Sequence, residues 1–330
     1  MLKVLLSACL LALLAAAGYG YWYAATPVVV ARLPASFDIP PGAGFRAATQ
    51  RIKAAGIGAG RIQFELLARA LGRDLDIKAG SYELVSAPTP MELLDKLTRG
   101  DVTQAEVKFI EGWNFRQLRA ALAAHAEIRH DSRGMSDPQL MARLGVAESH
   151  PEGLFFPDTY LFAKGSSDLH ILRRAYDAMQ RHLALEWEAR DPRVPYQSPY
   201  EALIMASIVE KETGRAEERD RISGALVNRL RIGMRLQVDP TVIYGLGEAF
   251  DGNLKKIHLQ TDGPYNSYLR TGLPPTPIAA TGLGALRAAL RPAKTDALYY
   301  VARGDGTSQF SRTLEEHNRA VRKYLLHGGR

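Results

Sequence analysis

The first hydrophobic segment of the chain is uncharged over positions 4–31 and strongly apolar over Val4–Tyr23. Twenty residues of α-helix are about 30 Å long, which matches the hydrocarbon core of a bilayer. Aromatic residues cluster at positions 19–23, as they do at the edges of transmembrane helices. The pattern therefore predicts a transmembrane anchor over residues 1–25, with the rest of the chain across the membrane from the cytoplasm.

Two other interpretations use the same segment. Ala15-Ala16-Ala17 offers a small-residue cleavage site for a signal peptide, and Leu6-Ser7-Ala8-Cys9 has the letters of a lipoprotein signal. The bulky residues that follow Ala17 and the short apolar stretch before Cys9 fit these alternatives less well. We therefore expect an uncleaved anchor.

Residues 27–105 alternate short β-branched stretches with helical patterns. Strands are predicted within 28–39 and at 81–85, and helices at 45–55 and 61–71 lie between them. A further helix should begin at Thr89, where Pro90 and Glu92 complete a capping box. Small units of this β-α-α-β order are common, and LysM-type carbohydrate-binding modules have it.

Residues 106–330 contain longer helical patterns and fewer strands. They predict a helix at 169–189, a hairpin of 298–301 with 309–311 across an Asp-Gly turn, and a closing helix at 314–326. The aromatic run 154–162 fits either a core segment or a wall that stacks on sugars. The whole chain therefore predicts an α+β fold: a transmembrane helix, a small LysM-like module at 27–105 and a larger α+β catalytic domain at 106–330.

One helix of this larger domain ends in unusual chemistry. Residues 202–209 are apolar all round apart from Ser207, so the helix should be buried, yet it continues into Glu210, Lys211 and Glu212. A buried carboxylate is costly unless it is paired, protonated or functional. Either the helix emerges into solvent at Glu210, or one of the two glutamates has a raised pKa and can donate and recover a proton. The helical pattern alone does not choose between Glu210 and Glu212.

Polar groups of fixed geometry follow this helix, together with a rigid proline loop at 272–278. Amides, a carboxylate and tyrosines are the usual lining of a sugar-binding groove. The candidate substrate-binding residues are Asn228, Gln237, Asp239, Tyr244, Asn266 and Tyr268.

Composition limits the remaining classes. The 330 residues are 46% hydrophobic and 23% charged, which excludes a disordered, collagen-like or multi-span membrane protein. The net charge of +7 is modest and spread along the chain, so it does not imply a nucleic-acid partner. Cys9 is the only cysteine, and the eight histidines form no close zinc pattern. With no P-loop, GxSxG or complete GxGxxG motif, we expect neither a metal nor an organic cofactor.

Several motifs occur in one order along the chain. They are KAGSYEL (78–84), EGW (111–113), FFPDTY (155–160), ASIVEKET (206–213), NRL (228–230), RLQVDPTVIYG (235–245), YNSY (265–268) and GLPPTPI (272–278). Together they resemble the YceG-like endolytic murein transglycosylases over residues 28–325. In this resemblance the catalytic acid, the first glutamate of EKET, falls on Glu210.

The resemblance implies a single-pass protein of the bacterial inner membrane whose catalytic domain faces the periplasm. Its substrate would be peptidoglycan glycan strands and its partners cell-wall synthases, the penicillin-binding proteins. A lytic transglycosylase needs one acid/base, because the 6-hydroxyl of the sugar is the nucleophile. A water-using muramidase would need a second carboxylate, for which Asp239 and Glu212 are candidates. The third possibility is a non-catalytic wall-binding scaffold.

Overall fold

The computed structural model describes residues 2–40 and 42–326 and divides the chain into two units. Unit 1 comprises residues 1–106 with two short later segments, 127–129 and 161–166, and unit 2 comprises the rest. Both units mix helices and short strands, so the predicted α+β class is confirmed.

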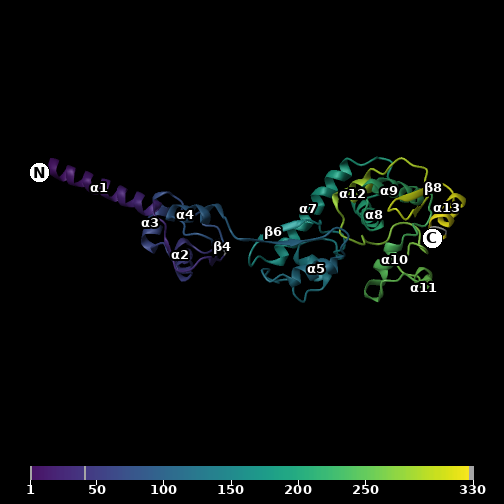
Figure 1. Cartoon of the computed structure of the whole chain (residues 1–330), viewed down its shortest axis with the longest axis horizontal. Helices are drawn as coiled ribbons and strands as arrows, with labels where there is room; N and C mark the ends of the chain where they lie inside the picture. The colour runs from purple at the N-terminus through teal and green to yellow at the C-terminus, as the bar shows by residue number, and fades with distance from the viewer. Residues whose placement is uncertain (1, 41, 327–330) are drawn as a thin grey trace. The chain divides into compact units, whose positions relative to one another are not determined.

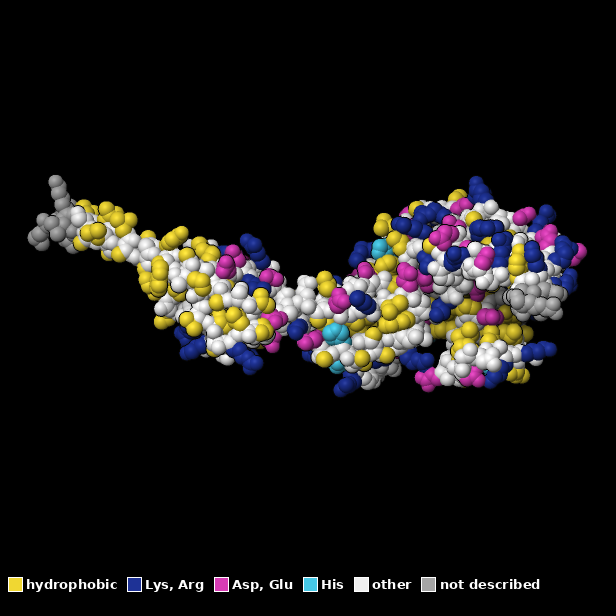
Figure 2. All heavy atoms as spheres, in the orientation of Figure 1, with side chains coloured by type: hydrophobic (Ala, Val, Ile, Leu, Met, Phe, Trp, Pro, Cys, Tyr) yellow, Lys and Arg dark blue, Asp and Glu magenta, His cyan; other side chains and the backbone are white. Residues whose placement is uncertain are grey.

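Unit 1 begins with α1 (Leu2–Ala25), a helix without a charged residue after Lys3. Among the described residues, Leu6–Ala25 is the one helical stretch long and apolar enough to cross a membrane, a test that a signal sequence also meets. Apolar side chains cover the described part of this helix (Figure 2). The predicted helix is therefore present.

The rest of unit 1 packs helices against two small antiparallel sheets (Figure 1). β1 (Val29–Val30) pairs with β3 (Ile57–Gly58), and β2 (Ala35–Ile39) pairs with β4 (Gly80–Leu84). The helices are α2 (Phe45–Ala54), α3 (Arg61–Ala70) and α4 (Pro90–Arg99). The predicted β-branched stretch is thus two strands that belong to different sheets. The glycine run between α2 and α3 contains the short strand β3.

The start of α4 follows the predicted capping box. Thr89 Oγ1 accepts the Glu92 N–H at 3.2 Å, and the Glu92 carboxylate accepts the Thr89 N–H at 2.8 Å. Gly100 ends the helix in the left-handed conformation, with φ of 71°. These bonds satisfy the end groups of α4, whose leucines 93, 94 and 97 enter the core of the unit.

The division between the units passes through β5 (Gln104–Lys108) and β6 (Thr159–Ala163), which pair with each other. Unit 2 then contains α5 (Phe115–Ala124), α6 (Asp137–Arg143), α7 (Asp168–Glu188) and α8 (Pro199–Glu212). It continues with α9 (Ala216–Arg231), α10 (Asp239–Leu246), α11 (Lys256–Gln260), α12 (Leu283–Leu290) and α13 (Leu314–Val321).

Helix α8 is the centre of unit 2, with α7, α9 and α12 around it (Figure 1). All residues of α8 from Ala202 to Val209 are buried, as the apolar pattern predicts. The predicted hairpin is also confirmed: β7 (Tyr299–Ala302) pairs with β8 (Ser308–Ser311). The predicted closing helix over 314–326 is present too: α13 covers Leu314–Val321, and a π-helix continues it over Arg322–Leu326.

The aromatic run 154–162 belongs mainly to the core. Phe155 is 1% exposed and stacks on Phe115 with ring centroids 5.1 Å apart. Tyr160 is also buried and packs on Phe109. Of the two interpretations of this run, the core segment is correct for these rings, because no face of Phe155 is left for a sugar.

Candidate active site

Glu210 lies at the last full turn of α8, yet its side chain is only 4% exposed. The interpretation that the helix simply emerges into solvent here is therefore wrong. Two groups bind the carboxylate: the Gly282 N–H donates to Oε2 at 2.9 Å, and Arg219 Nη2 donates to Oε1 at 3.2 Å. The acid is thus desolvated but not left without partners.

Opposing effects act on the pKa of Glu210. Burial is the largest and raises the pKa, because it disfavours the charged form. The Gly282 N–H, Arg219 and Lys211 lower it, and the nearby charge of Glu111 raises it. The net shift is upward, so the protonated acid persists to higher pH than it would in water.

Glu111 reaches this site from the segment before α5. Its Oε2 lies 3.9 Å from Arg219 Nη2, so Arg219 lies between two carboxylates. A backbone pair holds the segment in place: the Gly112 N–H donates to Ala280 O at 2.8 Å, and the Ala280 N–H donates to Trp113 O at 2.6 Å. The EGW motif thus brings a second carboxylate to Arg219, beside Glu210.

Glycines at 282 and 284 make room for these charged side chains. A Cβ at Gly282 would lie 1.8 Å from Glu111 Oε1, and one at Gly284 would lie 2.4 Å from Arg219 Nη1. Both glycines belong to the start of α12. The close approach of backbone to charge is what lets the Gly282 N–H reach Glu210.

Lys211 and Ser207 hold the neighbouring loops against α8. Lys211 Nζ donates to Gly112 O at 3.1 Å. Ser207 Oγ, fully buried, accepts the Ile278 N–H at 2.9 Å. The one polar residue of the buried helix therefore fixes the end of the proline loop.

A pocket of about 980 Å³ adjoins this cluster, and Lys211, Gly112 and Ile278 are part of its wall. Nine of its twenty lining residues belong to α5 and α10. Other residues of the wall include Asn114, Phe115, Arg116, Glu152, Tyr244 and Tyr265. Its size fits a chain of sugar rings rather than a small ion.

Glu152 is a buried carboxylate of this wall that the sequence reasoning missed. It is 3% exposed, and both of its oxygens accept the Phe115 N–H at 3.1 Å. Burial raises its pKa to about 7, although hydrogen bonds from Phe115 and Tyr244 lower it. Its place in the sequence, in an acidic residue–glycine pair directly before the aromatic run, could have drawn attention to Glu152. Nothing in the sequence pattern, however, linked it to α5.

Glu212, the other glutamate of EKET, points to a different environment. Its Oε2 accepts a 2.7 Å hydrogen bond from the Tyr300 hydroxyl of β7. Burial raises the pKa of Glu212, and it raises that of Tyr300 well above its ordinary value. Arg229 is also buried nearby, where its guanidinium donates to Leu298 O and Leu236 O.

Four of the six predicted binding residues, Tyr244, Asp239, Tyr268 and Gln237, have exposed or only partly buried side chains. Tyr244 is half-buried in the pocket wall and meets Tyr265 edge-on, with ring centroids 4.8 Å apart. Asp239 is exposed and accepts a 2.5 Å bond from the Tyr268 hydroxyl. Gln237 is exposed and has φ of 51°, a left-handed conformation that costs energy for a residue other than glycine.

Asn228 and Asn266 have their amides committed to the backbone. Asn228 Nδ2 donates to Thr295 O at 2.8 Å and to Ala297 O at 3.1 Å, which joins α9 to the approach to β7. Asn266 is 4% exposed, and its Nδ2 donates to three carbonyl oxygens of residues 258, 259 and 261. The structure therefore brings neither amide into the pocket beside Glu210.

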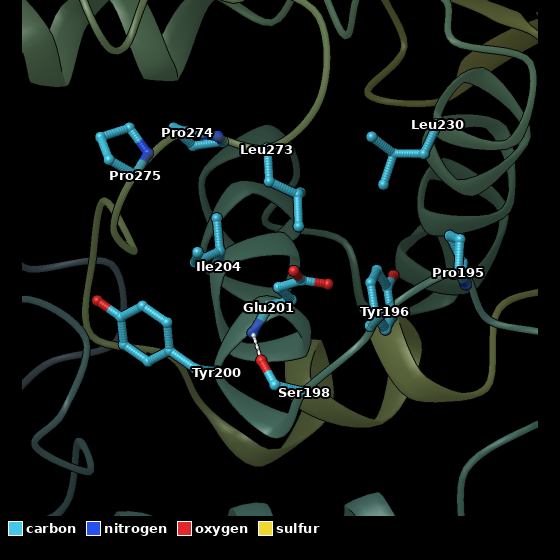
Figure 3. A pocket seen from close by; sticks show the side chains of 10 residues that line it. All are labelled: Pro195, Tyr196, Ser198, Tyr200, Glu201, Ile204, Leu230, Leu273, Pro274 and Pro275. Atoms are coloured by element: carbon cyan, nitrogen blue, oxygen red, sulfur yellow. Dashed lines mark hydrogen bonds between the residues drawn. The ribbon is translucent and has the colours of Figure 1, made fainter.

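A second pocket, of about 520 Å³, lies at the opposite end of α8 (Figure 3). The one carboxylate that lines this pocket is that of Glu201. Glu201 lies nine residues before Glu210 and so about 13 Å from it along the helix. Glu201 belongs to the helix start: it accepts the Gln197 N–H at 2.7 Å, while its own N–H donates to Ser198 Oγ at 3.3 Å. None of Glu210, Arg219 and Glu111 lines this pocket.

Charge is mixed over the surface around these sites. Figure 2 shows Lys and Arg interspersed with Asp and Glu over the visible face of unit 2, rather than gathered into a continuous basic track. Within residues 2–40 and 42–326, no group of three or more His, Cys, Asp or Glu is placed to hold a metal ion.

Known proteins resemble this chain both in sequence and in fold. The sequence is 34% identical to an endolytic murein transglycosylase of Bacillus subtilis over 75% of this chain and 73% of that protein. It is 27% identical to an endolytic murein transglycosylase of Streptococcus pneumoniae R6, over 96% of this chain but 64% of that longer protein.

A solved structure agrees with these sequence matches. The crystal structure of a YceG-like protein from Listeria monocytogenes has a TM-score of 0.55 and 29% identity, covering 86% of this chain and 98% of that one. The sequence model of the YceG-like family matches residues 37–323, which is most of the chain. The chain therefore belongs to the YceG-like family.

Proposed function

We propose that this protein is a peptidoglycan lytic transglycosylase and that Glu210 is its catalytic acid and base. The observation that carries the proposal is a desolvated carboxyl of raised pKa, 4% exposed, beside a pocket large enough for several sugar rings. The related endolytic murein transglycosylases of Bacillus subtilis and Streptococcus pneumoniae support the same reaction. The bond cleaved is the β-1,4 bond from N-acetylmuramic acid to N-acetylglucosamine, within a strand.

The proton path needs only Glu210. The protonated acid donates its proton to the 4-oxygen of the departing N-acetylglucosamine as the bond from C1 of the muramyl residue breaks. The resulting carboxylate takes the proton of the muramyl 6-hydroxyl, whose oxygen bonds to C1 and closes the 1,6-anhydro ring. Glu210 ends protonated, so the cycle consumes no water.

The partners of Glu210 suit both halves of this cycle. Arg219 and the Gly282 N–H stabilise the carboxylate form after the first proton transfer. Burial and Glu111 favour the protonated form that must be present at the start. With these opposing influences, the acid keeps a proton to donate at higher pH than an exposed glutamate would.

We extend the proposal to binding. Tyr244, in the pocket wall, would offer its ring to a sugar. Gln237 and the Asp239–Tyr268 pair, which are not part of that wall, would offer hydrogen bonds to a glycan that extends beyond it. Asn228 and Asn266 would shape the groove by holding its backbone rather than by touching the glycan.

The remaining expectations concern the cellular setting. Residues 1–25 would remain as a single-pass anchor in the bacterial inner membrane, with the catalytic domain (106–330) in the periplasm. Residues 27–105 would act as a LysM-like module that holds peptidoglycan. Cutting within new strands beside penicillin-binding proteins would end strand elongation.

The experiment is a product mass spectrum from the full-length protein, purified in detergent and incubated with isolated peptidoglycan. We expect anhydromuramyl ends, and none from a Glu210→Gln control. Reducing ends would indicate a muramidase instead, and the absence of any product from an intact protein would indicate a scaffold.

A further inference from the structure

Helix α1 enters the body of unit 1 with almost no linker. Thr26 and Pro27 are the two residues between the end of α1 and Val28, which is buried in the core of the unit. Thr26 Oγ1 donates to Trp22 O in the last turn of the helix at 2.7 Å, and the Val28 N–H donates to Pro88 O at 2.9 Å. The chain is therefore bound to the unit as soon as the helix ends.

The last turn of α1 also packs on the start of α3. The Tyr23 hydroxyl donates to Ala59 O, and Ala24 is buried. Ala59 comes directly before Gly60, the residue at which α3 begins. The two helices contact each other, and Figure 1 shows α3 beside the point where α1 meets the rest of unit 1. Packing, rather than a flexible tether, thus fixes α3 next to the end of α1.

Helix α3 has an apolar residue pair on each of two opposite faces. Phe64 and Ala68, four residues apart, are fully buried in the core of unit 1. On the opposite face, Ile62 is 66% exposed and Leu66, one turn further, is 60% exposed. Figure 2 shows apolar side chains that continue from α1 onto the adjoining surface of unit 1. Continuous apolar surface of this kind is typical of a contact with a membrane or a protein.

The length of α1 determines which of these two covers α3. The apolar stretch Leu6–Ala25 is 20 residues long. A helix of that length is about 30 Å long, which equals the thickness of the hydrocarbon core, whereas a bilayer with its headgroups is about 40–45 Å thick. Headgroups therefore extend roughly 5–8 Å beyond the end of α1. Because α3 starts beside Tyr23, in the last turn of α1, it starts at the depth of the headgroups.

We propose that unit 1 docks on the membrane surface through α3, with Ile62 and Leu66 inserted among the lipid headgroups beside the transmembrane helix. This inference rests on the proposed function, because that proposal places α1 in the membrane. The charges of α3 agree with it. Arg61, the first residue of the helix, is exposed and suits anionic lipid, and Glu65 is paired with Arg69 at 2.6 Å. Unit 1 is then held at the bilayer by two helices.

The test uses the full-length protein in vesicles of phosphatidylethanolamine and phosphatidylglycerol, with a fluorescent label on one cysteine at a time. The natural Cys9, which is exposed on α1, reports the anchor. In a Cys9→Ser background, Ile62→Cys and Leu66→Cys report α3. Ile232→Cys, at the end of α9 in unit 2, is the matched control, because Ile232 is the same residue type as Ile62 and is 63% exposed. Lipids that carry a nitroxide quench the labels that lie in the bilayer.

We expect headgroup nitroxides to quench the labels at positions 62 and 66 about threefold more strongly than the label at 232, since an interfacial helix lies within their reach. Adding Ile62→Asp should reduce the quenching at position 66 by about half, because a charge resists insertion. Equal quenching at 62, 66 and 232 would overturn the inference. A blue-shifted emission at 62 without quenching would also overturn it, because a protein surface, such as a second copy of the chain, would then cover α3.

The outcomes distinguish this inference from the proposed function. If acyl-chain nitroxides quench the Cys9 label but the labels on α3 are not quenched, the anchor stands and docking through α3 fails. If the Cys9 label is not quenched, the anchor fails and docking on the membrane fails with it. The formation of anhydromuramyl ends by the same proteins tests the reaction at Glu210 independently of both.

Discussion

The surroundings of Glu210 and of Glu212 differ sharply although both side chains leave the end of α8, two residues apart. Glu210 has a cation, a backbone N–H and a neighbouring carboxylate around it, and it adjoins the large pocket through Lys211. Glu212 lies roughly 200° further around the helix, where it accepts a hydrogen bond from the Tyr300 hydroxyl of β7.

The difference shows that two glutamates at one helix end can be buried against quite different partners. Burial raises the pKa of both glutamates, so a raised pKa alone does not identify the catalytic acid. What separates them is the partner: Arg219 and the Gly282 N–H bind the Glu210 carboxylate, whereas Tyr300 links Glu212 to the hairpin.

Glu210→Gln should have the largest effect on activity. The amide keeps the size and an acceptor oxygen but cannot carry the proton, so activity should fall about 10²- to 10⁴-fold. Anhydromuropeptide yield over time, by mass spectrometry, measures the loss. Glu212→Gln is the matched control and should retain activity within a few-fold, since its amide oxygen can still accept from Tyr300. The reverse order of losses would make Glu212 the acid.

Stability should respond to Glu210→Gln in a defined direction. Folding raises the pKa of Glu210, so the favourable contribution of its protonated form is complete at pH below the unfolded pKa and is lost as pH rises through the folded pKa. Above that value the native protein contains a desolvated charge. The thermal midpoint of the variant at pH 8 should therefore equal or exceed that of the native protein, and a clear fall would contradict this account of the site.

Arg219→Gln should have the next largest effect. Loss of a charge-assisted hydrogen bond to the Glu210 carboxylate is worth about 1.5 kcal/mol, or roughly tenfold in rate. Because Arg219 lowers the pKa of Glu210, its removal should also move the alkaline decline of activity to higher pH. The pH–rate profiles of the two proteins measure both effects. An unchanged profile would mean that a group other than Glu210 sets the decline.

The sequence predicted the elements that local rules determine. Thr89 and Glu92 needed only each other to form a cap, and the turn at Asp305-Gly306 needed only the two strands that flank it. The apolar run of α8 predicted burial correctly and raised the question of its terminal glutamates. These features depend on residues close together in the chain.

The site required contacts that no local pattern contains. Glu152 meets Phe115 across 37 residues, and Gly282 meets Glu210 across 72. Asn228 and Asn266 show the opposite failure: their type suggested a groove, but an amide serves backbone carbonyls equally well, and only the fold decides which it meets. The family resemblance selected Glu210, whereas the helical pattern did not.

Tyr300→Phe tests the structural side of the comparison. It removes the donor to Glu212 Oε2 and leaves a buried acceptor without that bond, which should cost about 1–3 kcal/mol of stability. Activity at low temperature should stay within a few-fold, because Glu210 and Arg219 keep their partners. Chemical denaturation and product yield measure the two quantities. A catalytic loss comparable to that of Glu210→Gln, in a protein still folded, would move the active site toward β7.

Glu111→Gln should have the smallest effect, opposite in sign to that of Arg219→Gln. The negative charge of Glu111 raises the pKa of Glu210, so its removal should move the alkaline decline of activity to lower pH. The shift should be slight, because the Glu111 side chain is 50% exposed and lies 3.9 Å from Arg219, where solvent screens the interaction. Raising the salt concentration should reduce the difference between the two proteins further, since exposed charges are screened first. Parallel pH–rate profiles at low and high salt provide the measurement. A shift to higher pH would mean that Glu111 acts on Glu210 mainly by holding Arg219 in place, and not through its own charge.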